Sequence, residues 1–526
     1  MSRLAVLVSA VLMAATACGL GQPPLAPKEA PSARGALAAD RIQILHTNDI
    51  HGHLEGETVR ASGRSFTQGG MPLLAGLARD LRGRAADRTL LLDAGDAWQG
   101  TLISSENRGQ ALTKIMSLMG YDAMTLGNHD FDWGQDVIAQ RAKESSFPFL
   151  AANVVETATG RSPPWARPYI VKDLGIAQVA VIGLTRPDLR TVTKATNVAG
   201  LRVAGVIETV KRYMPELRSQ ADIVVALTHV GYDQANGPEN DQALAAAVPE
   251  LDVIVGGHSH PTALRTARAV GNTTVVNTGS FAQNLGRLEL VLAHEKIAAV
   301  ERADELVTVS DGVAQPDAAV AAIVAERRAA ASEASRRVVG RTLVPLEASR
   351  DPDTPLGNLV ADALLEYGRG QGWRSDVAFY NGAGVRASLP VGEITFGRLF
   401  EVLPFSNQLV GLELTGAQLR TVLEAASPAP GSAGRLHPAG VRWEFRASEP
   451  SGRRVVAAAV GDAPLDPARM YRVVTIDYLY LGGDGHTAFG AGSDVRYGDE
   501  EIEAVTAYLG AHSPVDPKAD GRVVAR

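Results

Sequence analysis

Five short segments in the first half of the chain carry side chains that could bind metal ions. Imidazole, carboxylate and amide groups in such a mixture suit divalent ions such as Zn, Mn or Co. One histidine near a strand end is more often structural than a ligand, but five such segments in succession favour a shared site. The segments are Asp49-Ile50-His51, Gly95-Asp96, Gly127-Asn128-His129-Asp130-Phe131-Asp132, Thr228-His229 and Gly256-Gly257-His258-Ser259-His260.

The chemistry that such a set favours is two-metal hydrolysis of a phosphate ester. Two divalent ions about 3.5–4 Å apart can neutralise phosphoryl oxygens and make hydroxide from water, which then attacks phosphorus in line. The pair needs a bridging ligand, and the two oxygens of a carboxylate make Asp96 the candidate. Asp49 and His51 lie two residues apart on an extended segment, so both can face one ion.

His129 and Asp132 are expected to form a catalytic dyad beside the ions. A histidine oriented by a carboxylate can stabilise charge on the transferring phosphoryl group or on the leaving oxygen. We expect Asp130 to support its own loop. The remaining histidines of the first motif, His46 and His53, are expected to be structural or to lie at the rim.

Short apolar runs precede these segments and predict the strands that position them. They alternate with helical patterns, which indicates an α/β fold. Because the runs end in polar residues, the side chains should collect at the carboxyl ends of the strands, where ligands bind in α/β sheets. The predicted strands are Ile42–Leu45, Thr89–Leu92, Ala123–Leu126, Phe149–Val154, Gln178–Gly183, Ile223–Leu227, Val253–Val255 and Thr274–Val276.

The chain of 526 residues is too long for one core and predicts two domains. An Ala-rich helical segment without Pro or Gly indicates a connecting helix over 316–339. We therefore expect a catalytic domain over 40–315 and a second α/β domain over 340–526. The net charge of −7 comes without a basic stripe, which excludes a nucleic-acid-binding role.

Residues 1–17 combine Arg3 with an apolar run and small residues, the pattern of an export signal. Cys18, the only cysteine, follows this signal. It could be lipid-modified, or it could be the first residue left by ordinary signal peptidase. Residues 18–39 are rich in Pro, Ala and Gly and predict a flexible tether. The expected location is the periplasm or cell envelope, with membrane attachment only through Cys18.

The ordered motifs Asp-x-His, Gly-Asp, Gly-Asn-His-Asp, His and Gly-His-x-His resemble those of the metallophosphoesterase superfamily. More narrowly, His46-Thr-Asn-Asp49-Ile-His51-Gly52 and Asn128-His129-Asp130-Phe131-Asp132 resemble the 5′-nucleotidase family, which includes bacterial UDP-sugar hydrolases. The resemblance implies a four-layer α/β/β/α sandwich for the catalytic domain. It also implies one ion on Asp49, His51, Asp96 and His260, and another on Asp96, Asn128, His229 and His258. Several members carry Gln or Asn in place of His260.

The same resemblance assigns substrate binding to the second domain. Asn381-Gly382-Ala383-Gly384-Val385-Arg386 matches a run whose Asn and Arg bind the substrate in that family. The family also stacks a base between two aromatic rings, here Phe405 after Pro404 and Tyr478 ahead of Gly482-Gly483-Asp484-Gly485, and uses the Asp of that run. Some members carry a further Arg near the phosphates. The nearest basic residue upstream of Thr354-Pro355 is Arg350, so phosphate recognition is expected to depend on Arg386 and the metals.

The expected function is hydrolysis of 5′-nucleotides to nucleoside and phosphate outside the cytoplasm. Alternatives with the same metals are hydrolysis of UDP-sugars or 2′,3′-cyclic nucleotides, or the thiosulfohydrolase chemistry of a related protein. An alternative from another class is a metal-stabilised surface binding protein. The two stacking rings favour a base-containing substrate, and the complete ligand set with its dyad favours an enzyme.

Overall fold

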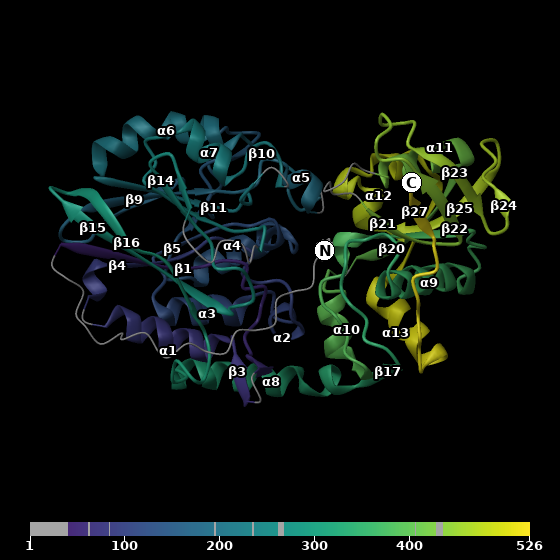
Figure 1. Cartoon of the computed structure of the whole chain (residues 1–526), viewed down its shortest axis with the longest axis horizontal. Coiled ribbons are helices and arrows are strands. Elements are labelled where there is room, and N and C mark those ends of the chain that lie inside the picture. Colours follow the sequence, from purple (N-terminus) through teal and green to yellow (C-terminus); the bar gives the residue numbers. More distant parts are fainter. Residues whose placement is uncertain are drawn as a thin grey trace, which may run out of the picture.

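The structure, a computed structural model, describes residues 40–526 except 62–63, 84, 194–195, 234–235, 261–267, 406 and 428–434. The predicted export signal, the tether and Cys18 lie outside the described residues. Two α/β domains are joined by one long helix, α8 (Ala318–Arg336), within the segment expected to connect them. Figure 1 shows α8 running along the N-terminal domain toward the C-terminal domain.

The N-terminal domain contains two stacked six-stranded sheets. The first has the order β16-β15-β1-β4-β5-β6 and the second β13-β14-β12-β11-β9-β8. The first consists of β1 (Arg41–Thr47), β4 (Thr89–Asp93), β5 (Ala123–Thr125), β6 (Phe149–Leu150), β15 (Asn284–Ala293) and β16 (Lys296–Thr308). The second consists of β8 (Tyr169–Asp173), β9 (Gln178–Leu184), β11 (Ile223–Thr228), β12 (Val253–Gly256), β13 (Arg268–Val270) and β14 (Thr273–Val276).

Helices cover the outer face of each sheet, which confirms the four-layer sandwich. One core lies between the sheets, and includes Ile44 and Val225. Two further cores lie under helices, one below α6 and α7 and the other below α1, α3, α4 and α8. Figure 1 shows α6 and α7 on one side of the sheets and α1 and α3 on the other. The helices are α1 (Met71–Arg82), α2 (Leu102–Ser105), α3 (Gln110–Met119), α4 (Gln135–Glu144), α5 (Leu189–Val192), α6 (Val206–Gln220) and α7 (Asp241–Ala247).

The central strands of both sheets are parallel, which brings their carboxyl ends to one edge. Their sequences are mostly apolar and buried, as in the β-branched run Ile223–Thr228 of β11, because helices or a second sheet cover both faces. Small antiparallel pairs complete the domain. These are β2 (Glu57–Ala61) with β3 (Arg64–Gln68), and β7 (Val154–Glu156) with β10 (Leu201–Val203).

One predicted strand is wrong in its extent. The run 149–154 is divided into β6 and β7, and residues 151–153 belong to neither. The Asn153 side chain accepts from Thr185 N at 3.1 Å and donates to Thr185 O at 2.7 Å. The buried side-chain amide thus bonds the chain to the residue after β9. These bonds take the place of backbone hydrogen bonds between strands.

The C-terminal domain is built on a five-stranded sheet of order β21-β18-β25-β20-β26 and a four-stranded sheet of order β24-β23-β22-β27. A third pair joins β17 (Val338–Thr342) and β19 (Gly392–Thr395). The sheets contain β18 (Val377–Asn381), β20 (Gln408–Thr415), β21 (Leu436–Ala439), β22 (Val441–Phe445), β23 (Val455–Val460), β24 (Ala463–Pro464), β25 (Met470–Ile476), β26 (Ser493–Glu500) and β27 (Val523–Ala525).

Helix starts in this domain follow local sequence signals. Thr354 accepts from Gly357 N, and Pro355 begins α9 (Pro355–Gly370). Thr415 and Gln418 form a reciprocal capping box at the start of α11 (Gly416–Ala425). The other helices are α10 (Phe396–Val402), α12 (Asp477–Tyr480) and α13 (Glu501–His512). None of the helices that the structure describes is both long and apolar enough to cross a membrane.

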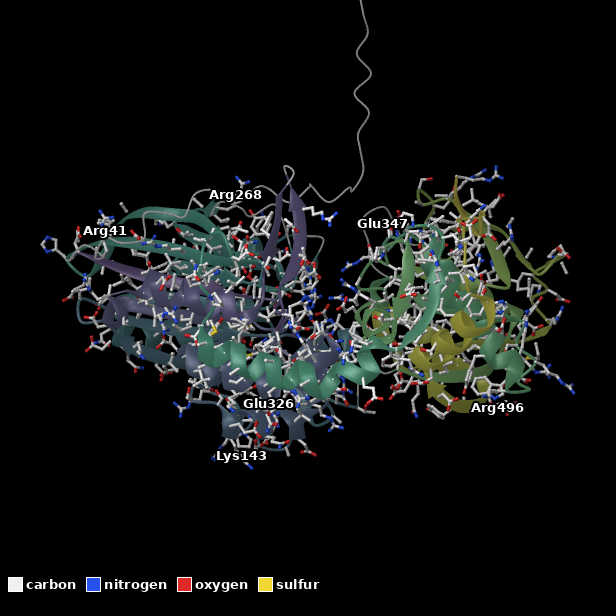
Figure 2. All side chains as sticks on the ribbon, turned by 90° about the horizontal axis from the view of Figure 1, so that it is seen from below. Arg41, Lys143, Arg268, Glu326, Glu347 and Arg496 are labelled. Carbon is white, nitrogen blue, oxygen red and sulfur yellow. The ribbon has the colours of Figure 1, made fainter. Side chains whose placement is uncertain are left out.

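Charged side chains surround both domains, as Figure 2 shows for Arg41, Lys143, Glu326 and Arg496. The connecting helix α8 is held against the N-terminal domain by its buried Val320 and Val324. Asp317, just ahead of α8, pairs with Arg79 of α1 at 2.5 Å.

Candidate active site

The residues predicted to bind metal follow strands of both sheets. Asp49 and His51 follow β1, Asp96 follows β4 and Asn128 follows β5 in the first sheet; His229 follows β11, and His258 and His260 follow β12, in the second. Six of the seven predicted ligands form two groups, each with its ligand atoms within 4.8 Å of one another. The groups are Asp49, His51 and His260, and Asp96, His229 and His258.

The first group converges on one point. His51 Nε2 lies 3.2 Å from His260 Nε2, and His260 Nε2 lies 3.0 Å from Asp49 Oδ1. Two nitrogens bound to one ion at about 2.0–2.1 Å, in a tetrahedral arrangement, lie about 3.4 Å apart. The separation therefore suits two ligands of a common ion.

Asp96 lies between the two groups. Its Oδ2 is 3.0 Å from His229 Nε2 and 3.8 Å from His51 Nε2. Its Oδ1 accepts a hydrogen bond of 2.8 Å from His129 N. Asp96 would therefore be able to help hold both ions, with its carboxylate oriented by the His129 backbone.

Asn128 joins the second group through its side-chain oxygen, which lies 3.1 Å from His258 Nδ1. The amide nitrogen of Asn128 donates to Val192 O at 3.4 Å. The amide is thus oriented with its oxygen toward the group, as a metal ligand would require.

Two histidines of the site are oriented by backbone carbonyls. His51 Nδ1 lies 2.9 Å from Gln99 O, and His229 Nδ1 lies 2.6 Å from Ala94 O. A proton on each Nδ1 leaves Nε2 as a lone-pair donor. Burial lowers the pKa of His51 well below its ordinary value, which keeps that ring neutral.

Among the described residues, Asp49 Oδ1 and His229 Nε2 are buried and make no hydrogen bond, although each lies 3.0 Å from another candidate ligand atom. Buried polar atoms are rarely left unsatisfied, because the desolvation cost is not recovered. A divalent ion in each group would satisfy both atoms. The donor set and its orphaned atoms therefore fit two divalent ions.

The backbone of the site is strained. Positive φ angles occur at five of the seven predicted ligands, namely Asp49, His51, Asp96, His258 and His260. Non-glycine residues rarely adopt this region, and such strain gathers at functional sites.

Asp130 supports the metal-binding loops, as expected. Its carboxylate accepts hydrogen bonds from Asp96 N, Ala97 N and Gly127 N at 2.9–3.1 Å. Burial, reinforced by the charge of Asp96, raises the pKa of Asp130 to about 7. His46 and His53 were expected to be structural or to lie at the rim. His46 packs against Gly286 of β15, and His53 lies 4.4 Å from the Phe281 ring.

The dyad has the expected contact. His129 Nδ1 lies 2.9 Å from Asp132 Oδ2, and Thr193 donates to Asp132 Oδ1 at 3.2 Å. Burial opposes protonation of His129, but the carboxylates of Asp132 and Asp96 outweigh it and raise the pKa of His129. Its Nε2 is left for a substrate oxygen.

The C-terminal domain contributes Phe405 and Arg386 to the same region. The Phe405 ring stacks on His129 with centroids 5.2 Å apart and an interplanar angle of 26°. The Arg386 guanidinium lies 5.8 Å from the centre of the Phe405 ring. Burial and the nearby Arg350 lower the pKa of Arg386, while Asp96 and Asp49 of the other domain act in the opposite direction.

Arg350 thus acts electrostatically on Arg386, although only Arg386 and the metals were expected to recognise the phosphate. The Arg350 backbone also lies beside the run that contains Arg386, since a Cβ added to Gly382 would lie 3.0 Å from Arg350 O. Its position shortly before Thr354-Pro355 was the available signal.

The remaining predicted substrate residues form one hydrogen-bonded group. Asn381 Nδ2 donates to Asp484 Oδ2 at 3.0 Å, and the Tyr478 hydroxyl donates to Asp484 Oδ1 at 2.9 Å. Asp484 adopts a positive φ of 51° in the turn after α12. This turn, Gly483–Gly485, contacts α5 of the N-terminal domain.

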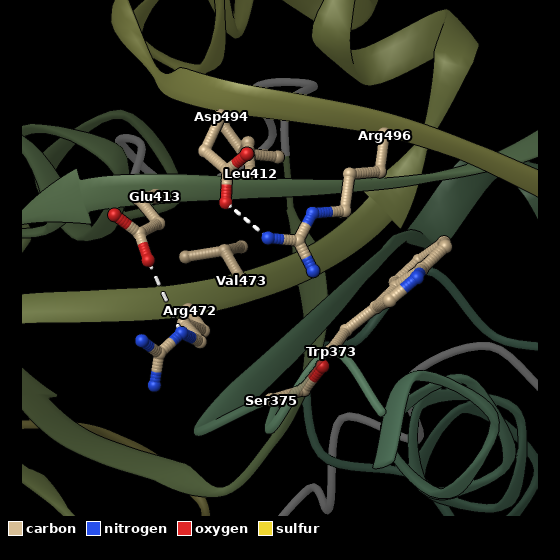
Figure 3. Close-up of a pocket in the computed structure, with 9 residues that line it drawn as sticks. Trp373, Ser375, Leu412, Glu413, Arg472, Val473, Asp494 and Arg496 are labelled. Carbon is tan, nitrogen blue, oxygen red and sulfur yellow. Dashed lines mark hydrogen bonds and ion pairs between the residues drawn. The ribbon is translucent and has the colours of Figure 1, made fainter. Parts of the chain in front are cut away.

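A small pocket lies elsewhere, on the five-stranded sheet of the C-terminal domain. Figure 3 shows it between Trp373 and the ion pairs Asp494–Arg496 and Glu413–Arg472. Its volume of about 10 Å³ leaves room for at most about one water molecule, and its lining contains none of the predicted site residues.

Gln99 is the residue that sequence reasoning missed altogether. It is 1% exposed, and its side chain donates to Pro404 O of the other domain at 3.0 Å. The only sequence signal was its position three residues after Asp96.

Two family models match the chain. The calcineurin-like phosphoesterase model matches residues 42–262, and the 5′-nucleotidase C-terminal domain model matches residues 338–491.

A 5′-nucleotidase from Diplobatis ommata is 30% identical over 93% of this chain and 91% of its own length. The trifunctional nucleotide phosphoesterase protein YfkN of Bacillus subtilis is 28% identical over 92% of this chain, which spans 35% of that longer protein. The crystal structure of a 5′-nucleotidase precursor from Thermus thermophilus superimposes with a TM-score of 0.82 at 29% identity, covering 92% of this chain and 99% of the other.

The extent of these matches, together with two candidate metal sites in the first domain, shows that the chain belongs to the 5′-nucleotidase family of metallophosphoesterases, which are phosphoric ester hydrolases.

Proposed function

We propose that the protein hydrolyses 5′-nucleotides to nucleoside and phosphate. The observation that carries the proposal is the stacking of Phe405, from the C-terminal domain, on His129 of the N-terminal domain. It brings the residues predicted to bind a base next to the residues predicted to act on a phosphate. The activities for which the similar proteins are named support the same substrate class.

Two divalent ions, held by the groups around Asp49 and Asp96, would supply neutralisation of the phosphoryl oxygens and activation of water. The chain's own residues do the rest. His129, held by Asp132, carries a proton at Nδ1 and offers Nε2 to the phosphoryl or leaving oxygen. Arg386, with Arg350 nearby, adds positive charge for the phosphate.

The nucleoside would bind on the side of the C-terminal domain. Phe405 and Tyr478 offer aromatic faces for a base, and stacking of this kind is worth roughly 1–3 kcal/mol per base. Asp484 is an acceptor for sugar or base donors, and Asn381 Oδ1 is a buried acceptor without a partner among the described residues. We take 40–315 as the catalytic unit, 316–339 as the connection and 340–526 as the substrate-binding unit.

The test is phosphate release by the purified chain with Zn, Mn or Co and a panel of substrates. The panel contains nucleoside monophosphates, UDP-glucose, a 2′,3′-cyclic nucleotide and p-nitrophenyl phosphate. We expect the highest kcat/KM with a nucleoside monophosphate and loss of turnover on chelation. No release from any nucleotide would refute the proposal.

Asp96→Ala is the variant that we expect to be inactive. It should lose turnover of all substrates while retaining the circular dichroism spectrum of the wild type. Glu326→Ala, on the exposed face of α8, controls for removing a carboxylate elsewhere. Retained turnover in Asp96→Ala would contradict the assignment of this residue to the metal pair.

Export and lipid attachment are part of the proposal and rest on residues 1–18 of the sequence. Expression of the full chain in a bacterial host should give an envelope fraction that contains the activity. If Cys18 is lipid-modified, Cys18→Ala should move the protein from the membrane fraction to the soluble envelope fraction. Equal distribution of both variants would contradict lipid attachment.

A further inference from the structure

Gln99 makes a hydrogen bond to each domain. Its backbone oxygen accepts from His51 Nδ1 at 2.9 Å, and its side-chain Nε2 donates to Pro404 O at 3.0 Å. The first bond orients a predicted metal ligand, and the second holds the residue before Phe405. One residue thus contacts both halves of the candidate site.

The surroundings make this contact part of a larger junction. Leu102, three residues after Gln99, packs against the core of the C-terminal domain, and α2 contacts α10. On the other side, Arg386 N donates to Val402 O at 3.0 Å, at the end of α10, two residues before Pro404. Gln99 therefore reaches a loop that directly follows the helix end bonded to the Arg386 backbone.

The bond to Pro404 exists only when the two domains are in contact. Surfaces between domains are usually polar and permit relative motion, so a buried hydrogen bond between them favours one arrangement. Gln99 is buried, and its Oε1 has no hydrogen-bond partner in the part of the chain that the structure describes, which adds a desolvation cost.

We infer that Gln99 is a positioning residue that fixes the Pro404–Phe405 loop against the metal-binding segment. Its side chain holds the loop that carries the base-binding ring, and its backbone oxygen orients His51. The inference rests on the proposed nucleotidase function for its kinetic consequence. Its structural consequence, the order of the loop, does not depend on the substrate.

The experiment compares the full chain with its Gln99→Ala and Gln99→Met variants, loaded with the same metal. Met keeps the length of the side chain and removes the donor. Gln110→Ala is the control, since Gln110 is exposed on α3 and its side chain bonds only to Glu144 among the described residues. Kinetics are measured with a nucleoside monophosphate and with p-nitrophenyl phosphate, and backbone hydrogen exchange is measured over 399–405.

We expect KM for the nucleotide to rise about tenfold in both Gln99 variants, with a smaller change in kcat. The loss of kcat/KM for the nucleotide should exceed the loss for p-nitrophenyl phosphate at least fivefold. Exchange over 399–405 should quicken in both variants and stay at the wild-type rate in Gln110→Ala.

Equal losses with the two esters would overturn the inference, because they would place Gln99 in metal binding alone. Unchanged exchange over 399–405 would overturn it as well. If the wild type cleaves only p-nitrophenyl phosphate, the proposed function fails, while exchange still decides whether Gln99 fixes the loop.

Discussion

The Tyr478 hydroxyl and the Asp484 residue are joined by two hydrogen bonds. The hydroxyl donates to Asp484 Oδ1 at 2.9 Å and accepts from Asp484 N at 3.2 Å. Gly483 fits against the ring, where an added Cβ would lie 2.5 Å from Tyr478 carbon atoms. The ring and the carboxylate predicted to bind the nucleoside are therefore one unit.

Tyr478→Phe should weaken nucleotide binding while it leaves the ring in place. Asp484 would lose a hydrogen bond of a kind worth about 1.5–3 kcal/mol when one partner is charged. We expect KM for a nucleoside monophosphate to rise about tenfold, with a smaller change in kcat, in steady-state kinetics. Tyr367→Phe is the matched control, because the Tyr367 hydroxyl makes the same two bonds to Asp499. A similar KM in wild type and Tyr478→Phe would show that the hydroxyl does not position Asp484.

Asp132→Asn should lower kcat by about 10²–10⁴-fold, the usual range for a general acid–base group. The amide would no longer stabilise a charged His129, and Thr193→Val should cause a smaller loss because it removes one bond to Asp132. Both variants should bind metal like the wild type, since neither residue belongs to the metal groups. The checks are kcat at saturating metal and elemental analysis. Thr157→Val, in an exposed loop, is the control for Thr193→Val. Loss of metal from Asp132→Asn would contradict a role of Asp132 outside metal binding.

The strand-end positions of the metal-binding residues could be predicted because each depends on a few neighbouring residues. Asp49, Asp96 and His229 each follow a short apolar run, and parallel strands bring such ends together. The contact between Gln99 and Pro404 could not be predicted in this way. It joins residues 305 positions apart and depends on how the two domains meet.

The hairpin formed by β15 and β16 was also missed, for a local reason. Arg287 and Glu289 interrupt its apolar pattern, yet Glu289 is buried. Arg287 donates to Gln43 of β1 at 2.8 Å and pairs with Glu289. Charges that are paired inside a sheet make a strand resemble a surface segment in sequence.

His437→Gln should reduce the loss of stability that the protein suffers in acid. Burial lowers the pKa of His437 to about 4, so the folded state binds its proton less tightly than the unfolded state does. Its contribution to stability is fully present above about pH 6.5 and is lost as pH falls toward 4. Between pH 7 and pH 5 this loss amounts to about 2 kcal/mol.

Urea unfolding of wild type and His437→Gln at pH 7 and pH 5 measures this difference. The free energy of unfolding should fall by about 2 kcal/mol less in the variant, since Gln does not titrate. Other titrating groups act equally on both proteins and cancel in the comparison. An identical pH dependence of the two proteins would mean that His437 is protonated equally in both states.

Gly127→Ala should disable the site by displacing Asp96. A Cβ at this position would lie 2.1 Å from Asp96 Oδ1 and 2.6 Å from Asp96 N, which is closer than real contacts allow. The Asp96 carboxylate would have to move, and Oδ2 would leave its position between His229 and His51. We expect the metal content to fall by at least one ion per chain and turnover to fall with it, because the proposed bridging ligand is out of place.

Gly510→Ala is the matched control for that change, because Gly510 lies in α13 with open space around a new Cβ. It should bind metal like the wild type and gain up to about 1 kcal/mol of stability, since alanine favours helices. Elemental analysis after gel filtration compares the three proteins. Full metal content in Gly127→Ala would mean that the Gly127 loop can shift while the Asp96 carboxylate stays in place. The steric explanation for this glycine would then be wrong.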